Sequence, residues 1–147
     1  MKTILNNVKI LRVIIFFSSL AFAAGSCEVA DDIVGNEDVA ALEGEWSVDE
    51  TSEVFDKSTL SVYAVTVSAD PDNLNGVIID NFYNVGISIK ATVSGNSLII
   101  PNQNAEDGYT VYGSGTISGN SSEINMSYTV NDGSAQDDNC TAVFTKI

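Results

Sequence analysis

From Gly44 to the end of the chain, apolar and polar residues alternate with a period of two. The clearest run covers residues 85–93, where valine, isoleucine and alanine alternate with glycine, serine, lysine and threonine. Such alternation is typical of half-buried strands, whereas sustained helical spacing is absent. The pattern predicts strands over residues 45–51, 61–68, 76–82, 85–93, 97–100, 109–117, 123–130 and 139–146.

The connections between these predicted strands are short and rich in turn-forming residues. Ser-Gly-Asn-Ser occurs at residues 94–97 and again at 118–121, and Asp132-Gly133 precedes the last strand. Such turns join neighbouring antiparallel strands, and no helical pattern separates them. We therefore expect an all-β fold, an eight-stranded antiparallel meander closed into a small barrel, with a β-sandwich as the alternative.

Two features of single residues refine this expectation. Gly113 and Gly115 in the sixth predicted strand would weaken a flat strand, and glycine there is natural where a sheet bends or another group approaches closely. This favours the barrel. Pro101 lacks a backbone N–H, so we expect it to end the fifth strand.

The N-terminal residues have a different composition from the rest. Lys2, Lys9 and Arg12 are followed by an apolar run over residues 13–23 and by small residues at 24–26, with no acidic residue. This arrangement predicts a secretory signal peptide, and the apolar run is shorter than the ~20 residues of a membrane span.

Two cleavage sites are compatible with this leader. Ala24-Gly25-Ser26-Cys27 resembles the bacterial lipoprotein signal, with Ala24 where leucine is usual, and would make Cys27 the lipid-anchored first residue. Ala21-Phe22-Ala23 instead fits ordinary signal peptidase. Cys27 would then be able to pair with Cys140, the only other cysteine, in an oxidising compartment.

The predicted organisation is a signal peptide at 1–26, an acidic tether at 27–42 with a helical turn near 38–42, and a β-domain at 43–147. Asp31-Asp32 lies close behind Cys27 and resembles the surface-export signal of lipoproteins in Bacteroidota-type bacteria. We expect an exported protein that is lipid-anchored at the outer membrane or cell surface of a Gram-negative bacterium.

Charge and composition exclude several classes of function. The chain has a net charge of −14, and because the leader holds three of the six basic residues and no acid, residues 27–147 carry −17. Such a surface repels phosphate backbones, so no nucleic-acid partner is expected. The chain has no histidine, which removes the common Ser-His-Asp and Cys-His catalytic sets and zinc sites. We expect no enzyme and no cofactor.

Two acidic segments have the residue types of a cation site: residues 70–76, and Asn131-Asp132-Gly133 together with Asp137-Asp138. Residues 70–76 resemble a calcium-binding loop, one residue out of register, and the alternative is an ordinary turn. We assign no metal site.

Gly44-Glu45-Trp46 resembles the Gly-x-Trp signature that begins the first strand in lipocalins and related barrels. The resemblance implies that Trp46 closes one end of the barrel, usually against an arginine of the last strand. No arginine follows Arg12, and Lys146 is the only basic residue of the last predicted strand. With the Asn-Phe-Tyr-Asn segment at 81–84, the resemblance extends over residues 42–147 to small lipocalin-like lipoproteins of Bacteroidota-type bacteria, a largely uncharacterised family.

The resemblance and the aromatic residues together suggest non-enzymatic binding of a small apolar or amphipathic ligand inside the barrel. The expected ligand-binding residues are Trp46, Tyr63, Phe82, Tyr109, Tyr128 and Phe144. The alternative is a structural or protein- or glycan-interaction module of the cell envelope, in which exposed Tyr83 and Tyr112 would carry the function. The sequence defines no protein partner.

Overall fold

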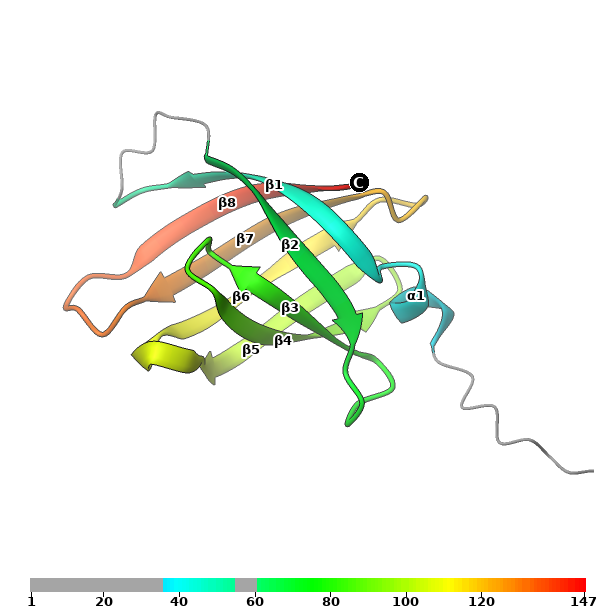
Figure 1. The fold of residues 1–147 in the computed structure, drawn as a ribbon, viewed down its shortest axis with the longest axis horizontal. Coiled ribbons are helices and arrows are strands. Elements are labelled where there is room, and N and C mark those ends of the chain that lie inside the picture. Colours follow the sequence, from blue (N-terminus) through cyan, green and yellow to red (C-terminus); the bar gives the residue numbers. More distant parts are fainter. Residues whose placement is uncertain (1–35, 55–60) are drawn as a thin grey trace, which may run out of the picture. The chain divides into compact units, whose positions relative to one another are not determined.

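Eight antiparallel strands close into a barrel in which each strand pairs with its neighbours in the sequence (Figure 1). The computed structural model describes residues 36–54 and 61–147. The strands are β1 Gly44–Ser52, β2 Ser61–Ala69, β3 Gly76–Phe82, β4 Ile87–Ser94, β5 Ser97–Asn104, β6 Thr110–Ile117, β7 Glu123–Asn131 and β8 Asp138–Lys146. Pairing of β1 with β8, from Trp46 opposite Lys146 to Ser52 opposite Cys140, completes the barrel. The prediction of an eight-stranded meander barrel is confirmed, and the β-sandwich alternative is wrong.

Two predicted strand limits are wrong for local reasons. Pro101 does not end the fifth strand, because the β5–β6 register shifts between Ile100 and Gln103 and so requires no ladder hydrogen bond from the proline. Val85 precedes β4, and its side chain is exposed instead of facing the interior with Ile87 and Ile89.

The interior of the barrel is filled by side chains from every strand. Alternate residues point inward, so that Trp46, Val65, Ile89, Ile124 and Phe144 all belong to one buried apolar cluster. Gly113 and Gly115 face the same interior, where an added Cβ would collide with Tyr128 and Met126 of β7. The close approach expected at these two glycines is confirmed, and it makes room for two large side chains of the neighbouring strand.

A short helix covers one end of the barrel, which we call the closed end. Helix α1, Glu37–Ala40, begins at Asn36, whose side chain accepts from the Asp38 N–H. Val39 and the following Leu42 are buried against the core, so the last part of the segment expected as a tether packs onto the barrel. None of the helices in the described residues is long and apolar enough to span a membrane.

Trp46 lies beneath this helix and is completely buried. Its indole N–H donates to Leu42 O at 2.8 Å. Lys146 Nζ lies 5.7 Å from the centre of the indole ring and donates to Ala41 O at 2.6 Å. A lysine therefore lies on the tryptophan, in the last strand, where the lipocalin resemblance implied an arginine.

Candidate functional site

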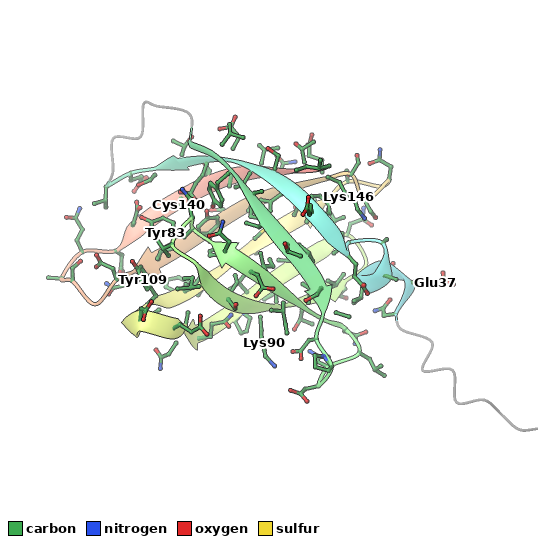
Figure 2. All side chains as sticks on the ribbon, viewed as in Figure 1. Glu37, Tyr83, Lys90, Tyr109, Cys140 and Lys146 are labelled. Carbon is green, nitrogen blue, oxygen red and sulfur yellow. The ribbon has the colours of Figure 1, made fainter. Side chains whose placement is uncertain are left out.

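The opposite end of the barrel, which we call the mouth, holds a pocket of about 300 Å³. Its walls come from the end of β1, the β3–β4 turn, Tyr109 after the short helix η1 (Glu106–Gly108), and the β7–β8 loop. Apolar and aromatic side chains at the pocket are Val54, Tyr83, Val85, Tyr109 and Val130. Polar ones are Asn84, Asp132, Ser134, Gln136 and Asp138. Figure 2 shows Tyr83 and Tyr109 at this end and Glu37 at the other.

The β3–β4 turn has an unusual backbone that places Tyr83 at the pocket. Asn81, Tyr83 and Asn84 all have positive φ, of 63°, 58° and 56°. Asparagine tolerates this region, but a tyrosine there is uncommon and costs about 1–3 kcal/mol. As a result, Phe82 and Tyr83 are both buried although they are adjacent in sequence.

The side chain of Asn81 holds this turn in place. Its amide donates to Ala64 O of β2 at 2.8 Å, and its oxygen accepts from the Gly86 N–H at 3.1 Å. The register of β3 and β4 shifts at the same point, between Asp80 and Phe82. The segment 81–84, which carries part of the lipocalin resemblance, is thus a bulge and turn that shapes one wall of the pocket.

Asp138, at the start of β8, organises the polar side of the pocket. It is 5% exposed. Its Oδ2 accepts from the Ser52 hydroxyl at 2.6 Å and from the Tyr83 hydroxyl, while Oδ1 accepts from the backbone N–H groups of Glu53 and Val54 at 3.1 and 3.0 Å. Burial opposes ionisation, but the hydrogen bonds from Ser52, Tyr83 and Val54 outweigh it and lower the pKa of Asp138. Burial and the neighbouring Asp138 raise the pKa of Tyr83, which keeps its hydroxyl a donor.

A second acid–tyrosine cluster lies deeper in the barrel. Glu50 is 2% exposed and points inward from β1, in line with Trp46 and Val48. Its Oε2 accepts from the Tyr63 hydroxyl at 2.6 Å and from the Tyr128 hydroxyl. Burial raises the pKa of Tyr63, with Glu50 adding to the effect, and burial with Tyr63 and Glu50 raises that of Tyr128. Both phenols therefore remain donors, and this cluster forms the polar part of the core below the pocket.

The structure distributes the predicted ligand-binding residues over the whole barrel. Of the six, Tyr109 lines the mouth pocket. Trp46 and Phe144 are fully buried in the core, Tyr63 and Tyr128 bond to Glu50, and Phe82 packs on Tyr128 with ring centres 4.7 Å apart. The sequence placed Asp138 only in an acidic cluster with the residue types of a cation site, although its alternation with the inward-facing Cys140 and Ala142 marked it as inward-facing.

Tyr83 was expected to be exposed in the interaction-module alternative, and that expectation is wrong because Tyr83 is 5% exposed. The left-handed turn that buries Tyr83 cannot be predicted from the apolar–polar alternation of the sequence. Tyr112 is 42% exposed on the outer face of β6, as that alternative required.

The acidic loop at residues 70–76 is bound by a lysine. Lys90 Nζ lies 3.0 Å from Asp70 Oδ2 and 3.6 Å from Asp72 Oδ2. Hydrogen bonds from Asp72 N and Lys90, in that order of effect, lower the pKa of Asp70. Within residues 36–54 and 61–147, no group of three or more potential metal-ligating side chains occurs. One lysine thus pairs with two aspartates, so it offsets part of the negative charge of this loop.

Cys140 lies inside the barrel, 2% exposed, with its sulfur 3.9 Å from Asp138 O. Figure 2 shows it at the mouth end, near Tyr83. Cys27, the predicted lipid-anchored residue, lies outside the described residues, as do the whole predicted signal peptide and most of the tether.

Comparison with models of known families finds no match, and comparison with curated proteins finds no relative. The class of protein shown by the fold is an all-β, eight-stranded antiparallel meander barrel.

Proposed function

We propose that this protein is a lipocalin-like envelope lipoprotein that binds a small amphipathic molecule, without catalysis, in the mouth of its barrel. The observation that carries the proposal is the mouth pocket: about 300 Å³, with three valines and two tyrosines as apolar surface and polar groups on one side. Small-molecule sites typically start near ~300 Å³ and combine apolar walls with a few placed polar groups.

The pocket lies at the mouth of the barrel, whereas five of the six predicted ligand-binding residues belong to its core. Side chains occupy the interior between Trp46 and Tyr128. The pocket lies nearer the mouth, beside Tyr83 and Asp138. Small barrels either fill their interior or leave room for one small ligand. Side chains fill the rest of the barrel interior, and this supports a ligand site at the mouth.

A neutral fluorescent probe, N-phenyl-1-naphthylamine, tests the pocket. The probe should brighten on binding to the native protein. Val85→Trp places a large side chain at the pocket and should weaken binding by about tenfold, a change of ~1.4 kcal/mol in binding free energy. Val62→Trp is the matched control, because Val62 is 61% exposed on β2 and does not line the pocket. Absence of binding, or equal binding by both variants, would overturn the proposal.

The lipid anchor on Cys27 is part of the proposal and rests on the sequence of the leader. Mass spectrometry of the mature N-terminus should find an acylated Cys27, and Cys27→Ser should release the protein from membranes while Cys140→Ser does not. A mature chain that begins at Ala24 with a Cys27–Cys140 bridge would overturn this part.

A further inference from the structure

The charge at the mouth pocket is of one sign among the residues described. Two of the lining side chains, Asp132 and Asp138, are acidic, and none is a lysine. The two lysines of residues 36–54 and 61–147 are engaged elsewhere: Lys90 with the Asp70 loop, and Lys146 on Trp46 at the closed end. A ligand in this pocket therefore meets a negative field, reinforced by the −17 charge of residues 27–147.

Asp132 and Asp138 contribute differently to the negative field in the pocket. Asp138 is buried, and its oxygens accept four hydrogen bonds from the protein, so it contributes a fixed negative charge behind the wall. Asp132 is exposed on the β7–β8 loop, where its Oδ1 accepts from the Ser134 N–H at 3.0 Å. Its carboxylate is accessible to a bound molecule and can pair directly with a cationic group.

Tyr83 and Tyr109 add an aromatic surface to the same pocket. The face of an aromatic ring attracts an ammonium group, and the attraction increases where water is excluded. An anionic group would instead lie against two carboxylates with no described lysine beside it, which is unfavourable.

We infer that the mouth pocket selects an organic cation: an ammonium group on a small apolar body, held by the carboxylate of Asp132 and the rings of Tyr83 and Tyr109 in the field of Asp138. This inference rests on the proposed function, since it names the chemical class of the ligand for the same pocket. It narrows the class of ligand from apolar or amphipathic molecules to amphipathic molecules with a positive charge.

Three probes of similar size separate charge from shape: 2-phenylethylamine, which is a cation at neutral pH, the neutral 2-phenylethanol, and the anion phenylacetate. Calorimetric titration of the exported protein should give the order amine, alcohol, phenylacetate, with about tenfold between the first two. Added salt should weaken binding of the amine more than that of the alcohol, because the salt screens the exposed Asp132.

Paired variants assign the effect to the pocket. Asp132→Asn should weaken the amine by about three- to tenfold and leave the alcohol unchanged. Asp49→Asn removes the same charge from the exposed outer face of β1 and should change neither. Tyr109→Leu should weaken the amine by about fivefold, whereas Tyr112→Leu, on the outer face of β6, should leave its affinity unchanged.

The outcomes separate this inference from the proposed function. Phenylacetate or the alcohol binding as tightly as the amine would overturn the cation preference and leave the pocket intact. The same follows if Asp132→Asn and Asp49→Asn weaken the amine equally. If none of the three probes binds, and the naphthylamine probe does not bind either, both the inference and the proposed function are wrong.

Discussion

The two ends of the barrel are built from opposite kinds of interaction. At the closed end, Trp46 and Leu42 are fully buried under α1, and Lys146 covers the indole ring. Towards the mouth, the buried side chains include Glu50, Ser52 and Asp138. Tyrosine hydroxyls donate to both acids, and Asp138 also accepts from the Ser52 hydroxyl and from backbone N–H groups. Buried polar groups require partners that apolar groups do not.

This difference indicates where the molecule obtains its stability and where it keeps room for a ligand. Apolar side chains at the closed end pack closely because their contacts are non-directional, and the pocket at that end, beside Asp38 and Ile117, is smaller, about 90 Å³. The polar groups at the mouth must keep fixed distances and angles, and the left-handed turn at Tyr83 adds strain. Strained, polar and partly open regions are where binding sites occur, whereas stability comes from the packed remainder.

The largest expected effect tests the closed end. Trp46→Ala should lower the free energy of unfolding by about 4 kcal/mol, because it removes a fully buried ring and the hydrogen bond to Leu42 O. Urea denaturation measures it. Tyr112→Ala, on the exposed face of β6, is the control and should lose less than about 1 kcal/mol. Equal losses in the two variants would mean that the closed end does not carry the stability assigned to it.

A smaller effect tests the deeper cluster below the mouth. Tyr128→Phe removes one hydroxyl donor to Glu50 but keeps the ring that packs on Phe82. We expect a loss of about 2 kcal/mol in the free energy of unfolding, since a buried acceptor loses a donor. Tyr112→Phe removes an exposed hydroxyl and should have no measurable effect. A Tyr128→Phe variant as stable as the native protein would show that the cluster is not held by this bond.

The mouth should also differ from the closed end in its response to acid. The folded pKa of Asp138 is below its ordinary value of 3.8, so its contribution to stability is complete above that value and is lost as pH falls through the folded pKa. Asp138→Asn should therefore cost about 1–2 kcal/mol at neutral pH, with a gap that closes as the pH falls below 3.8 and through the folded pKa. Urea unfolding at several pH values measures the gap, and a gap independent of pH would contradict the assignment.

The smallest expected effect concerns Lys146. Lys146→Met removes the cation from the face of Trp46 and the hydrogen bond to Ala41 O, and we expect a loss of about 0.5–1 kcal/mol. The emission of Trp46, the only tryptophan, should shift in this variant. Lys90→Met removes a lysine engaged with Asp70 and should leave that emission unchanged, whereas Lys146→Arg should retain native stability. A shift of equal size in Lys90→Met would show that the emission does not report the Lys146 contact.

Much of the fold could be predicted because strand alternation is a local property. Val65 and Val67, or Met126 and Tyr128, face inward simply because they are two residues apart on a strand with one buried face. The same rule carried more information than we used: Glu50 follows Trp46 and Val48 in the inward series, and Asp138 precedes Cys140 and Ala142. Because both are charged, we did not predict that Glu50 and Asp138 face inward, although their spacing indicated it.

The site was less predictable because its contacts join distant parts of the chain. Ser52 and Asp138 meet only because β1 pairs with β8, and Tyr83 reaches Asp138 only through a turn in which Asn81, Tyr83 and Asn84 have positive φ. The apolar–polar alternation of the sequence does not predict this turn. The six aromatic candidates were chosen by residue type, which does not distinguish a ring that packs in the core from one that lines a pocket.

By itself, the sequence determined the strand order, the meander connections and most of the inward-facing apolar side chains, since each depends on spacing along a strand or on short turns. The lack of histidine also excludes catalytic sets that require this residue. Only the tertiary structure decided that the barrel closes, that Lys146 lies on Trp46, and that Tyr83 and Asp138 meet beside a pocket at the mouth. These features depend on contacts between residues far apart in sequence, which form only when the first and last strands pair.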